Sequence, residues 1–67
     1  MALKVLIRNA EGVREVTLLP GQLLRLKPGE ELILPAGVEV ATTGDLVILT
    51  DPAGTTFPVD VPPGATI

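Results

Sequence analysis

The side chains of this sequence best suited to acid–base chemistry or to binding a metal are its carboxylates. The main candidates are Asp45, Asp51 and Asp60, together with Glu30, Glu31 and Glu39. A Ca²⁺ or Mg²⁺ site needs several converging oxygen ligands, and the sequence contains no D-x-D-x-D-G loop. Asp45 follows a glycine and Asp51 precedes a proline, and aspartate at such positions commonly caps a turn. We therefore expect no metal site.

The residue types that usually carry catalysis are missing. The chain contains no Cys, His, Ser, Tyr or Trp. Without Ser or Cys the common nucleophilic triads cannot form, and without His no side chain titrates near neutral pH unaided. Threonine hydroxyls at positions 42, 43, 55 and 56 have no evident base, and threonine is common in strands. No glycine lies in a phosphate-binding motif. We expect no catalytic residue, no cofactor and no small-molecule substrate.

Charge and aromatic content bear on the possible partners. Five Lys and Arg residues against eight Asp and Glu residues give a formal charge of −3, and Phe57 is the only aromatic residue. Nucleic acid would be repelled on average and would find no stacking surface. Apolar stretches such as 46–49 are far shorter than a membrane span, and residues 1–8 lack the apolar segment of a signal peptide. We expect neither nucleic acid nor a membrane as partner.

The elements that must position these residues are short strands. Seven glycines, at positions 12, 21, 29, 37, 44, 54 and 64, recur every seven to ten residues and mostly coincide with turn signals. The runs between them are apolar and rich in β-branched residues, which is typical of a β-sandwich or barrel. The sequence predicts a single all-β domain over residues 1–67: a small sandwich, barrel or half jelly roll with Pro-Gly corners. The predicted strands are 2–8, 13–19, 23–27, 31–34, 38–42, 46–50 and 55–61, and for 13–19 a short helix is the less favoured alternative.

Two kinds of turn are expected between these strands. Asp51-Pro52-Ala53-Gly54 fits a type I turn followed by a left-handed glycine, which closes a hairpin between the strands on either side. Residues 9–12 are expected to close a second hairpin. Pro20-Gly21 and Pro28-Gly29 fit type II turns, which suit corners between sheets. The L-x-P-G pattern around these corners repeats about every eight residues. A solenoid is therefore a further alternative, although solenoid repeats are usually longer.

Alternation along the strands divides the apolar residues into two sets. One set is predicted to form the core: Leu3, Val5, Ile7, Val16, Leu18, Leu24, Leu26, Leu32, Leu34, Val38, Val40, Ile48, Phe57, Val59 and Val61. The second set is predicted to face outward: Leu6, Leu19, Leu23, Ile33, Val47 and Leu49. Outward apolar residues in so small a domain indicate an interface between subunits of a homo-oligomer, the alternative being strands that are buried on both faces. Pro58 predicts that the last strand lies at a sheet edge or is bulged.

The whole chain resembles idealised, de novo designed β-proteins and designed homo-oligomers. The resemblance rests on regular turn segments at 27–31, 34–38, 50–55 and 61–64, on plain Leu, Val and Ile cores, and on the missing residue types. It implies a non-enzymatic subunit that self-assembles. Low Asn, Gln and Met, absent Cys and abundant Pro also suit a thermostable protein of a thermophile. Two natural alternatives stay open. One is a small structural or binding module such as a virion decoration or tail protein. The other is an adhesin module, because residues 44–56 are similar to a hairpin of large repetitive bacterial adhesins.

Overall fold

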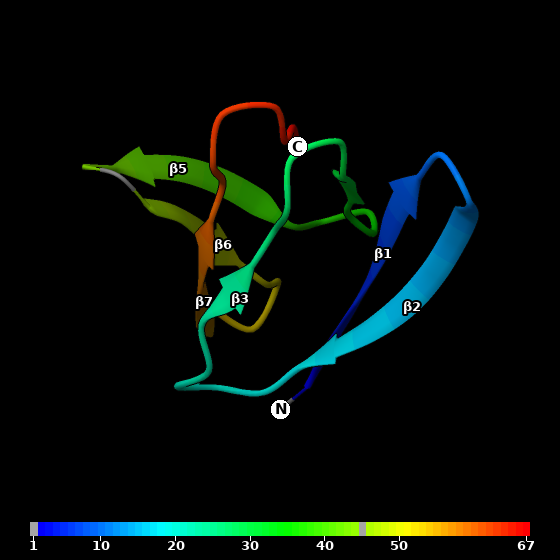
Figure 1. Ribbon diagram of the computed structural model, residues 1–67. Helices are drawn as coiled ribbons and strands as arrows, with labels where there is room; N and C mark the ends of the chain where they lie inside the picture. Colours follow the sequence, from blue (N-terminus) through cyan, green and yellow to red (C-terminus); the bar gives the residue numbers. More distant parts are fainter. Residues whose placement is uncertain (1, 45) are drawn as a thin grey trace.

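The computed structural model describes residues 2–44 and 46–67, and Figure 1 shows them as strands in two sheets packed face to face. The all-β prediction is confirmed: the fold is a compact small sandwich and not a closed barrel. The strands are β1 (Leu3–Asn9), β2 (Gly12–Leu18), β3 (Leu24–Arg25), β4 (Glu31–Ile33), β5 (Glu39–Thr43), β6 (Leu46–Thr50) and β7 (Thr56–Asp60). Each predicted strand has a counterpart in the structure.

The first sheet has the strand order β2-β1-β4, and the second has the order β3-β7-β6-β5. Both predicted hairpins are confirmed. β1 pairs with β2 in a register that places Leu3 opposite Leu18, and β6 pairs with β7 so that Thr50 lies opposite Thr56. Neighbouring strands are antiparallel except β3 and β7, whose short parallel contact was not predicted.

The turns follow the predicted chemistry. The N–H of Gly54 donates to the carbonyl of Asp51 over 2.9 Å, and Gly54 has a φ of 89°, as a type I turn ending in a left-handed glycine requires. At the Pro20-Gly21 corner the N–H of Gln22 donates to the carbonyl of Leu19 over 3.1 Å. This corner and the one at Pro28-Gly29 carry the chain from one sheet to the other. The repeated L-x-P-G pattern therefore marks corners of a sandwich rather than coils of a solenoid.

The core lies between the two sheets. Its largest fully buried side chain is that of Phe57 on β7, which lies opposite Leu49 of β6. From the first sheet, alternate residues of β1 point inward, as predicted. The buried apolar residues are Leu3, Val5, Ile7, Leu18, Leu26, Leu32, Leu49, Phe57 and Val59.

The prediction for β6 is wrong by one residue. Leu49 is 0% exposed and belongs to the core, whereas Ile48 lies opposite Pro58 on the outer face and is half-buried. Because residues 46–49 are all apolar, alternation gives no signal there, and the face is decided by pairing with β7. The other error concerns Val40. It shares the inner face with Leu49 but is 48% exposed, because the first sheet does not cover β5 (Figure 1).

Pro58 neither places β7 at an edge nor bulges it, because the register with β6 is unbroken from Leu46–Asp60 to Thr50–Thr56, and this corrects that prediction. β7 lies between β3 and β6. The ladder with β3, however, contains only the pairs Leu24–Val59 and Arg25–Asp60. Pro58 lies just beyond its end, so its missing N–H costs no ladder hydrogen bond there.

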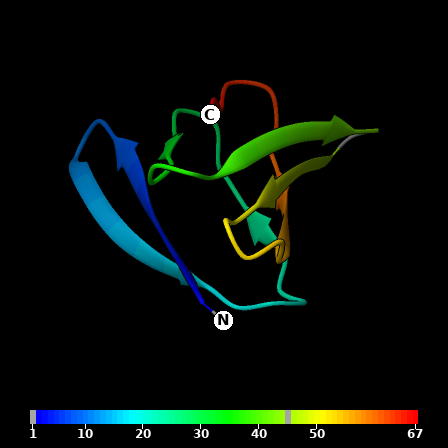
Figure 2. The same ribbon diagram turned by 180° about the vertical axis from the view of Figure 1, so that it is seen from behind.

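The free side of β4 is covered by the end of the chain. The N–H of Leu32 donates to the carbonyl of Thr66 over 2.9 Å, and the N–H of Thr66 donates to the carbonyl of Glu30 over 3.0 Å. Among the described strands, β2 and β5 are therefore the long outermost ones. Figure 2 shows them on opposite sides of the molecule.

Candidate interaction surfaces

The six apolar residues predicted to face outward do not form one surface. Leu49 is fully buried against Phe57, and Val47 packs against the same core. Their predicted outward orientation is wrong, for the reason given for β6. Leu49 cannot reach a partner unless the sandwich opens, and Val47 is only partly exposed. This leaves two pairs to consider, Leu6 with Ile33 and Leu19 with Leu23.

Leu6 and Ile33 lie directly opposite each other on β1 and β4, on the outer face of the first sheet. Leu6 is 38% exposed and Ile33 is half-buried. Together with the exposed Pro35 they form what we term the outer-face patch. A shallow hollow of about 220 Å³ runs along it. Its lining includes Lys4, Leu6, Glu15, Ile33, Leu34 and Pro35.

The charges around the outer-face patch are mixed in sign. Lys4 lies on β1, and Glu15 lies on β2 directly opposite Leu6. At the far end of the same face Arg8 forms an ion pair with Glu31 of β4. Such an exposed ion pair contributes little to stability. It does neutralise that end of the face, so the patch carries no excess of either charge.

Leu19 and Leu23 lie away from the outer face, in the connection between β2 and β3 at the end of the molecule shared with the start of β1 (Figure 1). Both are exposed. The N–H of Leu19 donates to Oε1 of Gln22 over 3.3 Å, which fixes the corner between the two leucines. They form a second apolar spot, in a loop rather than on a strand.

The sequence prediction missed further exposed residues. Val13 on β2 is 56% exposed, and Val40 and Ile67 are also exposed. Every residue of β5 is exposed, and β5 pairs only with β6 among the described strands. Alternation places Val40 on the correct face, but it carries no information on how far the opposite sheet extends.

The carboxylate of Glu30 is buried and fully engaged. Oε1 accepts the N–H of Lys27 over 2.6 Å, and Oε2 accepts a hydrogen bond from Nη1 of Arg14 over 2.9 Å. The N–H of Lys27 and the guanidinium of Arg14 both favour the charged form, so the pKa of Glu30 lies below its ordinary value. Glu30 therefore ties the Pro28-Gly29 corner to β2. This is a structural role, in which each carboxylate oxygen accepts one hydrogen bond.

The remaining candidate carboxylates that the structure describes do not converge. Asp51 is buried, and its Oδ1 accepts the N–H of Thr55 over 2.7 Å, which confirms it as a turn cap. Glu39 is exposed at the start of β5, and Asp60 lies opposite Leu46 in the second sheet. Asp45 lies outside the described residues. In residues 2–44 and 46–67 no group of three potential metal ligands occurs.

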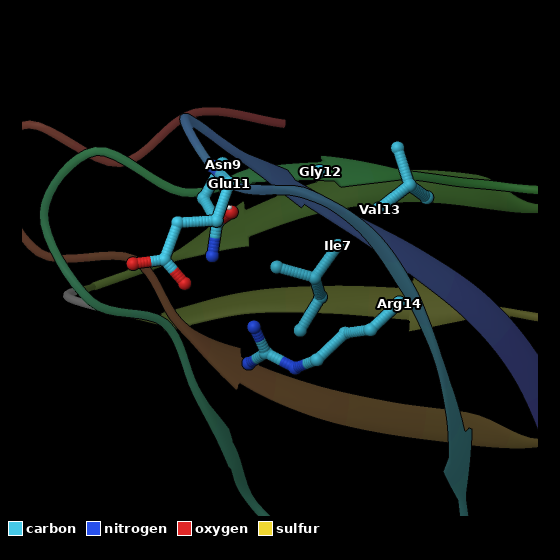
Figure 3. Close-up of a pocket in the computed structure, with 6 residues that line it drawn as sticks. All are labelled: Ile7, Asn9, Glu11, Gly12, Val13 and Arg14. Carbon is cyan, nitrogen blue, oxygen red and sulfur yellow. Dashed lines mark hydrogen bonds between the residues drawn. The ribbon is translucent and has the colours of Figure 1, made fainter.

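A hollow of about 220 Å³ lies at the turn of the β1–β2 hairpin. Figure 3 shows that Val13 and Arg14 point to opposite sides of β2, with the guanidinium of Arg14 reaching past Ile7. The guanidinium of Arg14 is bound to Glu30, and Oδ1 of Asn9 accepts the N–H of Glu11 over 2.9 Å, so these two side chains serve structural contacts. The hollow has no convergent polar groups that would orient a ligand.

Comparison of the chain with protein-family models, with curated proteins and with solved structures finds no match. Within the part of the chain that the structure describes, no helix is long and apolar enough to cross a membrane.

Proposed function

We propose that this chain is a non-enzymatic structural domain whose function is to self-associate through the outer-face patch of its first sheet. The observation that carries the proposal is the cross-strand pair of Leu6 and Ile33 outside the sandwich. A one-sided antiparallel sheet is normally polar on its solvent face. Two adjacent branched aliphatic side chains on that face lose water when a second copy covers them.

The surroundings of the patch favour a second copy over a different partner. A symmetric dimer brings the same surface of both subunits together, so the surface must be complementary to itself. Lys4 and Glu15 supply one charge of each sign beside Leu6. Two copies can therefore meet without net repulsion. A small domain also gains stability from association that its own thin core cannot supply.

The proposal retains the origin suggested by the resemblance, a designed homo-oligomer. The Pro-Gly corners between sheets, each with glycine at the position of positive φ, are what an idealised design would contain. A natural structural or binding module that uses the same patch is the alternative, and it would remain monomeric when purified alone.

Leu6→Lys tests the patch, because it places a charge at the centre of the proposed contact while the side chain remains in water in the free subunit. The matched control is Ala53→Lys, which makes the same change of charge in the exposed turn between β6 and β7. Light scattering coupled to size exclusion should show a lower mass for Leu6→Lys than for the parent chain, and no change for Ala53→Lys. Equal masses for all three chains would refute the role of the patch. Far-UV circular dichroism checks that each variant is folded.

A further inference from the structure

Pro58 on β7, two strands away, shows in which direction the backbone N–H and carbonyl groups of β5 point. In an antiparallel ladder, opposite residues alternate between pairs that exchange both N–H···O bonds and pairs that exchange none. Pro58 has no N–H and lies opposite Ile48, so this pair exchanges none. The N–H and carbonyl of Ile48 therefore point the other way, toward Ala41 of β5.

It follows which groups of β5 are free. Ala41 exchanges its backbone hydrogen bonds with Ile48 of β6. The neighbouring residues Val40 and Thr42 therefore turn their N–H and carbonyl groups away from β6. Among the described residues, β3, β7 and β6 complete the rest of this sheet and nothing pairs with that side of β5. β5 is thus an edge strand with two residues whose N–H and carbonyl groups point away from the sheet, and such edges pair readily with another strand.

We infer that β5 pairs antiparallel with β5 of a second copy, with Ala41 opposite its own symmetry mate. The inference rests on the proposed self-association and adds a second contact to it. In this register Val40 of each copy lies opposite Thr42 of the other, and both residues have outward-facing backbone groups. Each such pair exchanges both N–H···O bonds. The second sheet of one copy and that of the other then form one continuous sheet across the twofold axis.

The side chains of β5 fit this register. Glu39 lies opposite Thr43 of the other copy, so no like charges face each other. Ala41 lies at the axis in a pair without hydrogen bonds, where the two backbones are closest and a small side chain fits. On the inner face, Val40 gains the neighbouring Thr42 as a cross-strand contact, which covers apolar surface that the first sheet leaves open.

The other long edge, β2, is less suited to the same pairing. Its interior carries Arg14 and Glu15, and charged residues are a common device that protects an edge. Symmetric pairing over the whole of β2 is centred on Glu15 and places that carboxylate opposite its own copy. Like charges directly opposite each other destabilise a strand pair.

Disulfide crosslinking tests the register directly, because the chain contains no cysteine. The test variant is Ala41→Cys, and the matched control is Ala53→Cys, another exposed alanine. Pairs without hydrogen bonds have Cα atoms about 4.5 Å apart, which lies within the range that a disulfide spans. With oxidised glutathione as oxidant and protein at about 10 μM, Ala41→Cys should form a covalent dimer on the order of 100-fold faster than Ala53→Cys, because paired thiols have an effective concentration of about 1 mM.

A second pair of variants removes a hydrogen-bond donor instead of adding a crosslink. Thr42→Pro deletes an N–H that faces away from β6, so no ladder bond within the subunit is lost. Thr17→Pro does the same on the free side of β2. The N–H of Leu32 points to Thr66, so Leu32 and its partner Ile7 exchange no bonds, and Ile7 bonds to Arg14 instead. Alternation from Arg14 along β2 then turns the N–H of Thr17 away from β1. Thr42→Pro should lower the mass measured by light scattering, and Thr17→Pro should not.

The outcomes separate this inference from the proposed function. If the parent chain assembles but Ala41→Cys crosslinks no faster than Ala53→Cys, the β5 contact is wrong and the outer-face patch stands. If Ala41→Cys crosslinks rapidly while Leu6→Lys leaves the mass unchanged, the β5 contact stands and the patch is wrong. A monomeric parent chain in which both cysteines react at the same slow rate overturns both.

Discussion

Leu49 and Ile48 are neighbours on β6 that face opposite sides of the sheet. Replacing each by alanine measures how much each side chain contributes to the free energy of unfolding. Leu49 is fully buried, so Leu49→Ala should cost about 3 kcal/mol, the sum of the lost transfer free energy and a cavity term. Ile48 is half-buried on the outer face, and Ile48→Ala should cost about 1 kcal/mol. A domain of 67 residues has a total stability of roughly 3–10 kcal/mol, so the first loss is a large fraction of it.

Urea unfolding followed by far-UV circular dichroism is the suitable assay, because the chain has no Trp or Tyr to report by fluorescence. With a slope of about 1 kcal/mol/M, the midpoint should fall by about 3 M for Leu49→Ala and by about 1 M for Ile48→Ala. All samples need the same protein concentration, because association raises the apparent stability. Equal losses, or a larger loss for Ile48→Ala, would refute the register of β6 and return Leu49 to the surface.

Two further predictions concern the corners. The lowered pKa of Glu30 means that the folded state binds its proton less readily than the unfolded chain, so this carboxylate stabilises the fold above the ordinary glutamate pKa of about 4.3 and that contribution is lost as the pH falls through the lower folded value. Glu30→Gln should therefore flatten the acid limb of a stability–pH curve from urea midpoints, and an unchanged limb would contradict this role. Gly64→Ala should cost more than Gly21→Ala in the same assay. Both glycines have a positive φ, but a Cβ at Gly64 would lie 3.1 Å from a proline side chain whereas one at Gly21 meets nothing within 4 Å. Equal costs would show that the close contact is unimportant.

The parts of the fold that could be predicted from the sequence are those decided by neighbouring residues. Pro20-Gly21 dictates its turn through φ preferences, Asp51–Gly54 adds the capping side chain of Asp51, and the strands between turns follow. The strand 46–50 shows the limit, because four consecutive apolar residues give no alternation and only the pairing with β7 places Leu49 inside. The parallel pairing of β3 with β7 likewise depends on tertiary packing and has no local sequence signal.

The candidate surfaces divide in the same way. Leu6 and Ile33 could be predicted to face outward because charged neighbours on their strands mark the polar face. That they lie side by side follows only from the register of β1 with β4. The β5 edge could not be found from the sequence, since its exposure depends on how far the first sheet reaches and its free backbone groups depend on Pro58, two strands away.

The central claim is that this chain associates with itself, and its mass in solution tests that claim most directly. Light scattering coupled to size exclusion, at two protein concentrations, should give one sharp species whose mass is a whole multiple of the 7.0 kDa chain and does not change on dilution. A species of 7.0 kDa at both concentrations would contradict the account. The outer-face patch would then serve a different partner or none.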